Sequence, residues 1–214
     1  RACQLAEFDG LWRPNRFADP RHEGELFVGT NYRMSDVEAA INVVKLGKLS
    51  AVVKGYRTAR RRLVRHLKTF RQIRPQTVND PDGQVGYQLR FFPDTPELGQ
   101  AIAAALTEAG VRAGCRGKDH WPDWHCSAYM FPVTLKTSHV PGGSVFEDPR
   151  YLAAGGKAKY DADDCPVARD LFAREVSVGV SSSWTADDCK RVAATINRVL
   201  AEHCDEDPDA KGWA

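Results

Sequence analysis

The 214-residue sequence contains no apolar run that approaches the roughly 20 residues of a membrane-spanning helix, which excludes a spanning protein. It also lacks an excess of charge of one sign. The 30 Lys and Arg residues against 28 Asp and Glu leave a net charge of +2, too small to recruit nucleic acid or anionic membrane through a global field. Hydrophobic residues form 43% of the chain and charged residues 27%, which is the balance of a folded globular protein and argues against disorder.

The cysteines lack the C-x-x-C spacing of zinc ribbons and redox motifs. Their wide separation favours reduced thiols over a disulfide framework, and therefore predicts a cytoplasmic protein. The six are Cys3, Cys115, Cys126, Cys165, Cys189 and Cys204. An initiator methionine and the apolar core of a signal peptide are also missing from the first ten residues, so we expect the chain to begin inside a longer polypeptide.

The sequence predicts an α+β protein in which a long bridging helix precedes a small α/β sandwich domain. Residues 1–34 have apolar side chains but no periodic element, so we expect them to pack on sequence outside the chain or on a partner. Ser35 and Glu38 form a capping box that begins a helix expected over residues 35–75. A small domain over 76–204 and a loosely held acidic tail over 205–214 complete the expected organisation.

Within the small domain the predicted order is β-α-β, loop, α-β-α, with the helices on one face of a small sheet. Alternation of apolar and polar residues predicts the strands, and the caps Thr95 and Thr185 with the stop signal Gly110 bound two of the helices. The expected strands are 87–92, 111–113 and 175–180, and the expected helices are 95–109, 166–174 and 185–203. Residues 114–150 have no clear period and predict a long functional loop.

The second half of the long helix carries a run of basic residues: Arg57, Arg60, Arg61, Arg62, Arg65, His66 and Lys68. We interpret the run as a solvated face whose charge suits a helix C-terminus. Nucleic-acid binding is the alternative, which the lack of interleaved stacking aromatics disfavours.

Motifs for metal, nucleotide or hydrolase chemistry are incomplete. The spacing of Cys115, His120, His125 and Cys126 matches no common zinc site, so no metal site is predicted. The glycine pairs form no phosphate-binding loop, and the serines of residues 181–183 lack the G-x-S-x-G context of a hydrolase.

The most specific stretch is Gly29–Ile41, with the sequence G-T-N-Y-R-M-S-D-V-E-A-A-I. It resembles the G-x-N-Y-R-M-S-[DE]-x-x-A-A segment of the DegT/StrS sugar aminotransferases, fold-type I enzymes that use pyridoxal phosphate. The Arg-rich helix, the strand over 87–92 and the closing stretch Cys165–Leu171 follow in the family's order. The resemblance covers almost the whole chain, but only the C-terminal half of a family member. It implies the C-terminal domain of such an enzyme, with residues 1–34 at the end of the large cofactor-binding domain.

The resemblance implies cofactor-binding roles for two residues. Asn31 would reach the cofactor phosphate across a dimer interface, and a capped turn is the alternative role for this amide. Arg33 would add positive charge to the same phosphate or to the substrate. Tyr32 would stack on the substrate or donate its hydroxyl, unless it is buried against the long helix.

The loop after the second predicted strand carries three further substrate-binding candidates. In many relatives a histidine of this loop lines the active site near the sugar, and His125 matches it. Trp124 belongs to the same W-x-x-W-H sequence, and a flat indole suits the face of a sugar or nucleotide. His120 is a further candidate for the same role. Structural aromatics packed under a long loop are the alternative.

Two departures from the family pattern bear on the chemistry. Family members place the lysine that binds the cofactor covalently upstream of the Gly-x-Asn motif, and residues 1–28 contain no lysine. No catalytic residue is therefore predicted in this chain, and the lysine is expected upstream of it. The closing strand Ser177–Trp184 carries serines where the family has a proline-rich turn.

The resemblance implies a pyridoxal-phosphate-dependent aminotransferase that converts a keto-sugar or cyclitol, often nucleotide-linked, with an amino acid as donor, as in amino sugar and antibiotic biosynthesis. The chain is expected to act as a homodimer or with a chain that carries the N-terminal half, without nucleic acid or membrane partners. Two alternatives stay open: a non-catalytic subunit that lends residues to a complete subunit's site, and a sugar dehydratase on the same cofactor.

Overall fold

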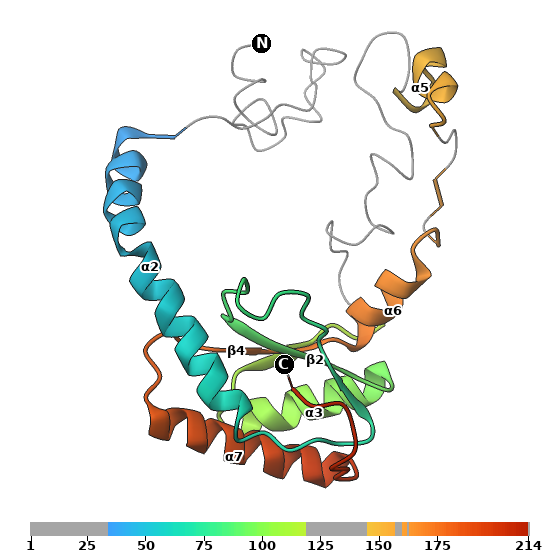
Figure 1. Cartoon of the computed structure of the whole chain (residues 1–214). Helices are drawn as coiled ribbons and strands as arrows, with labels where there is room; N and C mark the ends of the chain where they lie inside the picture. The colour runs from blue at the N-terminus through green and yellow to red at the C-terminus, as the bar shows by residue number, and fades with distance from the viewer. Residues whose placement is uncertain (1–33, 119–144, 157–159, 162, 214) are drawn as a thin grey trace. The chain divides into compact units, whose positions relative to one another are not determined.

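The computed structural model describes residues 34–118, 145–156, 160–161 and 163–213. The chain divides into two units, and Figure 1 shows the described residues of both. The described residues of one are 34–44, 145–156, 160–161 and 163–166, and those of the other are 45–118 and 167–213. The sheet and every buried core residue of the described ranges belong to the second unit. The expectations for residues 1–33, and for most of the long loop over 114–150, fall outside the described residues.

The long helix α2 spans Asp36–Val64. Its predicted capping box is confirmed, since the Ser35 amide donates to a Glu38 carboxylate oxygen at 2.9 Å and the Glu38 amide donates to Ser35 Oγ at 3.2 Å. The expectation of a helix over 35–75 was wrong beyond Val64. The amide of His66 bonds to the carbonyl of Leu63 at 3.1 Å in a tightened last turn, after which the chain carries Phe70 into the core.

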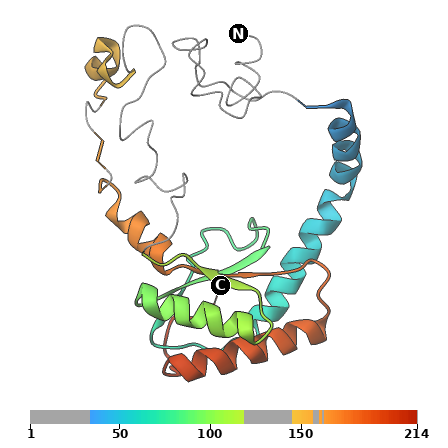
Figure 2. The same cartoon turned by 180° about the vertical axis from the view of Figure 1, so that it is seen from behind.

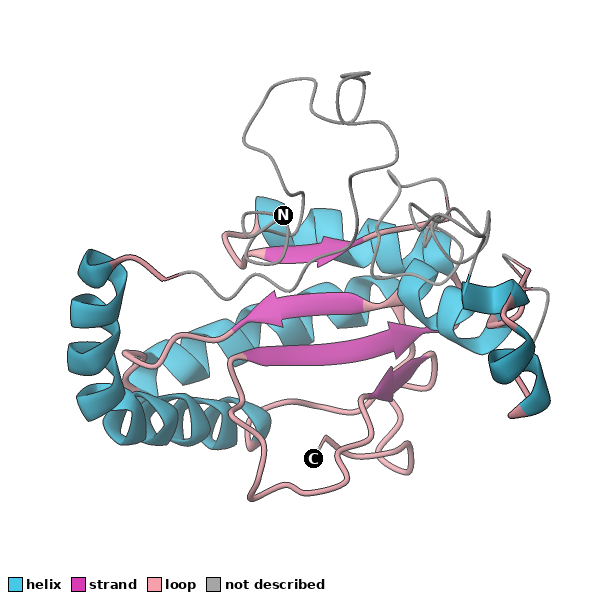
Figure 3. Cartoon of the chain, turned by 90° about the horizontal axis from the view of Figure 1, so that it is seen from above, coloured by secondary structure: helices cyan, strands magenta, loops and turns pink. Residues whose placement is uncertain are grey.

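Four antiparallel strands form a sheet in the order β1-β2-β4-β3 (Figure 3). They are β1 (Ile73–Pro75), β2 (Gln88–Pro93), β3 (Ala113–Cys115) and β4 (Val176–Gly179). The registers pair Leu89 with Val178 and Ile73 with Pro93. Strand β2 confirms the predicted alternation, because Leu89, Phe91 and Pro93 are buried and the residues between them are not. Strand β1 was missed because its three residues lie within the expected long helix.

Helices α3 (Pro96–Glu108) and α7 (Ala186–His203) lie side by side on one face of the sheet (Figures 1 and 2), which confirms the α+β class. Their predicted caps are confirmed: Thr95 Oγ1 accepts from the Leu98 amide at 3.1 Å, and Thr185 and Asp188 form a capping box. The largest fully buried side chains come from strands, helices and the segment after α2: Leu63, Phe70, Leu89, Phe91, Pro93, Ile102, Leu106, Val176, Val178, Ile196, Val199 and Leu200.

Three shorter helical segments complete the described structure. They are η3 (Val145–Glu147), α5 (Pro149–Ala153) and α6 (Pro166–Arg174). Helix α6 has the predicted bounds. Within the described ranges, no helix combines the length and apolar character needed to cross a membrane.

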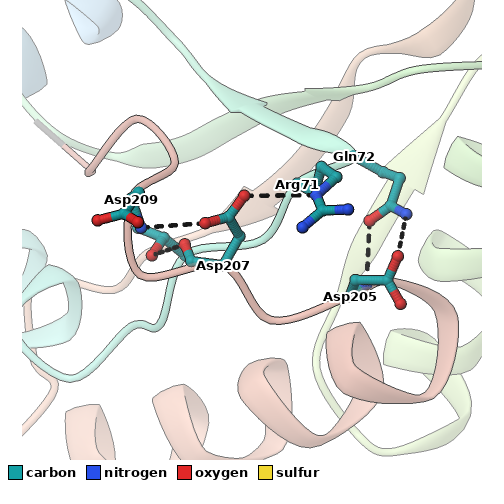
Figure 4. A network of polar contacts seen from close by, with 6 residues as sticks. Arg71, Gln72, Asp205, Asp207 and Asp209 are labelled. Atoms are coloured by element: carbon teal, nitrogen blue, oxygen red, sulfur yellow. Dashed lines mark hydrogen bonds and ion pairs between the residues drawn. The ribbon is translucent and has the colours of Figure 1, made fainter.

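The acidic tail is bound to the domain, contrary to the expectation of a loose segment (Figure 4). The Arg71 amide donates to the carbonyl of Asp205 and the Asp207 amide to that of Thr69, each at 3.0 Å. Gln72 and Asp205 exchange two further hydrogen bonds of 2.9 Å. The tail therefore forms main-chain hydrogen bonds with residues 69–71, just before β1. Its charge-rich composition gives no sign of this pairing.

Candidate functional site

The motif that carries the family resemblance, Gly29–Ile41, runs across the capped start of α2 into its first turns. Both the main-chain amide and the hydroxyl of Ser35 donate to Glu38, and these bonds lower the pKa of the Glu38 carboxyl. A fixed carboxylate in the first turn also suits the positive end of the helix. The capping box therefore fixes the chain at Ser35–Glu38, directly after the predicted cofactor-binding positions in the sequence.

The residues predicted to bind cofactor or substrate lie outside the described residues. Asn31, Tyr32 and Arg33 precede residue 34, and His120, Trp124 and His125 fall between residues 118 and 145. Their roles stay predictions, and the described residues define only the points at which their two segments are attached.

The loop that carries the three candidate substrate-binding residues leaves the sheet from a fixed point after β3. The Gly117 amide and the Cys115 thiol both donate to the carbonyl of Ala173, at 2.9 and 3.4 Å. Lys118 forms an ion pair of 2.9 Å with Glu97 at the first turn of α3. Burial raises the pKa of the Cys115 thiol, which keeps it protonated and agrees with the predicted structural role of the cysteines.

The described residues do not fit a complete pyridoxal phosphate site. A lysine that binds this cofactor covalently must be desolvated or held beside another cation. Every lysine in the described ranges is exposed, including Lys45, Lys48 and Lys54 on α2. The covalent chemistry of the cofactor therefore cannot be derived from this part of the chain.

A polar hollow on the sheet was not singled out from the sequence. It measures about 200 Å³ and is lined by residues 84–88 together with Gln76 and Arg90. Arg90 Nε donates to Gln88 Oε1 at 3.0 Å and lies 3.3 Å from a carboxylate oxygen of Glu175, so its charge is largely neutralised. The hollow offers amide and guanidinium donors to a polar group. In the sequence, the hollow is indicated only by Gln88 and Arg90, the polar positions that alternate with buried residues in the predicted strand over 87–92.

The interpretation of the basic run as a solvated face was wrong for Arg60. This side chain is only 6% exposed, whereas Arg61, Arg62 and Arg65 are exposed. Ala59 and Leu63 share its buried face of α2. One arginine of the run therefore points inward at a position where helical periodicity calls for an apolar residue.

The fold is shared with solved aminotransferase structures. The chain superimposes on 3-amino-5-hydroxybenzoic acid (AHBA) synthase with a TM-score of 0.53 at 19% identity, covering 89% of this chain and 44% of that one. For DesV from S. venezuelae the TM-score is 0.52 at 14% identity, with 91% and 42% covered. For the aminotransferase TlmJ from Streptoalloteichus hindustanus it is 0.51 at 17% identity, with 89% and 46% covered. The chain spans less than half the length of these structures.

The described residues have the fold of part of a fold-type I aminotransferase. The model of the DegT/DnrJ/EryC1/StrS aminotransferase family matches residues 3–137, which is more than half of the chain. The chain therefore belongs to this family, whose members use pyridoxal phosphate.

Proposed function

We propose that this chain is the C-terminal part of a pyridoxal-phosphate-dependent aminotransferase that acts on a keto-sugar or cyclitol, possibly nucleotide-linked, with an amino acid as donor. The observation that carries the proposal is the family match over residues 3–137, which includes the whole Gly29–Ile41 motif. The capping box at Ser35 supports it, because it fixes the chain immediately after the positions assigned to the cofactor.

In this proposal Asn31 and Arg33 bind the cofactor phosphate, and Tyr32, His120, Trp124 and His125 surround the substrate. A loop amide before a helix N-terminus presents donors to a dianion, and a guanidinium matches phosphate geometry. The role of the chain toward the cofactor is thus to bind and orient it.

Activity requires a polypeptide that supplies the covalent lysine, since the described lysines are exposed. The first turns of α2 support an interface with such a polypeptide. Met34, Val37 and Ile41 are 59%, 70% and 49% exposed, and Val44 continues the series at 57%. Apolar side chains at helical spacing with this exposure favour coverage by another chain segment, in a homodimer or a complex with the N-terminal half.

The proposal is tested by adding pyridoxal phosphate to the chain alone and to the chain combined with the polypeptide that carries the N-terminal half. Borohydride reduction and peptide mapping of the chain alone should label no lysine stoichiometrically. The complex should bind the cofactor and change its visible absorbance when an amino acid donor is added. Specific labelling of Lys45, Lys48 or Lys54, or a complex that never responds to a donor, would contradict the proposal.

The same samples separate the two alternatives. A complex that dehydrates the sugar without incorporating nitrogen would identify a sugar dehydratase. A complete subunit that gains activity when this chain is added, while this chain contributes no lysine, would identify a non-catalytic partner.

A further inference from the structure

Arg60 is a buried arginine that packs against the main chain of the loop between β1 and β2, residues 76–87. Gly86, at the end of that loop, has a positive φ of 83°. A Cβ atom built on Gly86 would lie 2.9 Å from Arg60 Cδ and 3.2 Å from Arg60 Cβ, so the loop backbone packs directly on the aliphatic part of the side chain. The same loop is tied to the helix by Arg57, whose Nε donates to the carbonyl of Gln84 at 2.9 Å and whose Nη2 donates to that of Gly83 at 3.1 Å.

Among the residues that the structure describes, the guanidinium of Arg60 has no hydrogen-bond or ion-pair partner. Its Nε atom is buried and donates no hydrogen bond to any described residue, and no ion pair to Arg60 occurs within the described ranges. Burial of an unpaired charge is strongly unfavourable. Burial therefore also lowers the pKa of the Arg60 guanidinium. Arginine stays protonated nonetheless, because its ordinary pKa is far above neutrality. A buried positive charge without a counter-charge points to a ligand that supplies one.

The hollow beside Arg60 has the composition of an oxyanion site. It measures about 100 Å³ and is lined by three arginines of α2 and four residues of the loop. These are Arg57, Arg60 and Arg61, with Pro81, Asp82, Gln84 and Gly86. Among the described residues Arg61 makes a single hydrogen bond, from its Nε to the carbonyl of Arg57 at 3.3 Å. Asp82 makes no ion pair with any of the three among the described residues. Three guanidinium groups against one exposed carboxylate leave a local excess of positive charge.

A larger hollow continues from the same arginines along α2. It measures about 370 Å³, shares Arg57 and Arg61, and is otherwise lined by Leu49, Ser50, Val53 and Lys54. Its walls combine aliphatic side chains with one further cation. The two hollows together offer an anion site with an adjoining, mostly apolar surface for the rest of a ligand.

We propose that the hollow formed by Arg57, Arg60 and Arg61 binds the phosphate group of a small phosphorylated molecule. Guanidinium groups match phosphate with paired, charge-assisted hydrogen bonds. A phosphate dianion also balances the excess charge better than a single carboxylate does. The inference is independent of the proposed aminotransferase reaction, since it uses only residues of the described second unit.

The test measures binding of inorganic phosphate and of pyrophosphate to the full chain by calorimetry at low ionic strength. Both anions should bind, and Arg60→Gln should weaken binding on the order of tenfold or more, since it removes a charged donor. Arg62→Gln is the matched control, because it removes an exposed charge from the same helix and should change affinity less than about twofold.

A second variant covers the case in which Arg60→Gln does not fold. Arg61 is exposed, so Arg61→Gln should retain the circular dichroism spectrum and still weaken phosphate binding several-fold. Absence of phosphate and pyrophosphate binding would overturn the proposal, as would equal binding by the wild type and the Arg60 and Arg61 variants. Acetate binding as tight as that of phosphate would overturn the assignment to phosphate and identify a carboxylate site.

Discussion

The indole ring of Trp213 meets the ring of Phe91 edge-on, with 5.5 Å between ring centroids and an angle of 82° between the planes. Phe91 belongs to the central strand β2 and is fully buried. The indole nitrogen of Trp213 also donates to the carbonyl of Lys68 at 2.8 Å. The end of the acidic tail therefore contacts the centre of the domain and the segment that follows α2.

Substitution of Trp213 is expected to destabilise the whole domain. Trp213→Ala removes the edge-to-face contact and one hydrogen bond, which together stabilise by about 1–3 kcal/mol. Chemical denaturation followed by circular dichroism measures the loss. Asp209→Ala, an exposed position of the same tail, is the control and should change the free energy of unfolding by less than about 0.5 kcal/mol. Equal effects of both variants would show that the tail contributes only by its charge.

Gly86 and Gly110 provide a matched pair of glycines with φ values of 83° and 82°. Gly110→Ala meets no atom within 4 Å and should cost only the left-handed backbone penalty of about 1–2 kcal/mol. Gly86→Ala bears the same penalty and also forces Cβ to 2.9 Å from Arg60 Cδ, so it should cost about 1–3 kcal/mol more. Denaturation of both variants side by side measures the difference. Equal losses would mean that the loop moves away from α2 without cost.

Thr185 begins α7, and its hydroxyl accepts from the Asp188 amide at 3.1 Å. Thr185→Ala removes this cap and should lower the free energy of unfolding by about 1 kcal/mol. Ser50→Ala, at an exposed site within α2, is the control and should stay within about 0.5 kcal/mol of the wild type. An effect no larger than that of the control would show that α7 is held by core packing alone.

The cap also predicts a dependence of stability on pH. The Thr185 hydroxyl and amide donate to Asp188 and lower the pKa of its carboxyl below the ordinary 3.8. The stabilisation is complete above the ordinary pKa and is lost as the pH falls through the lowered value of the folded state. The stability difference between wild type and Thr185→Ala should therefore shrink when denaturation is repeated below about pH 3. A difference that persists unchanged in acid would contradict this role of Asp188.

Asn31→Ala tests the strongest assignment carried by the family resemblance. A hydrogen bond to a charged acceptor contributes about 1.5–3 kcal/mol, so cofactor affinity should fall roughly ten- to hundredfold while folding is retained. The measurement requires the complex that carries the covalent lysine, with cofactor affinity and melting temperature determined on the same sample. Asn79→Ala, in an exposed turn, is the control. Unchanged affinity with a lowered melting temperature would mean that Asn31 only caps a turn.

Local signals in the sequence predicted the elements whose determinants are local. The capping residues Ser35, Thr95 and Thr185 each make the expected hydrogen bonds. Gly110 adopts the positive φ expected of a helix stop. Each of these signals acts over three or four residues, and tertiary contacts do not override them.

The end of α2, the burial of Arg60 and the pairing of the tail depend on contacts between residues far apart in the sequence, so local sequence signals did not predict them. Leu67 and Phe70 continue the apolar spacing of α2, yet the helix ends at Val64 because Phe70 packs in the core. The inward position of Arg60 depends on the loop that closes over it at Gly86, and composition alone places an arginine among solvated residues. The tail pairs through its main chain, which carries no sequence signal.

The pairing of the tail beside β1 has a consequence for self-association. Strands β1 and β3 are the two edges of the sheet, and each is three residues long. Phe70 forms a β-bridge with Glu206 just before β1, and Lys68 forms an ion pair with Glu206 at 2.7 Å. Short edges and a charged flanking segment offer few unpaired amides to a neighbouring sheet, which is how natural proteins avoid edge-to-edge aggregation. The tail thus covers the main chain just before the β1 edge. Its removal would leave main-chain amides and carbonyls free to pair with a strand of another molecule.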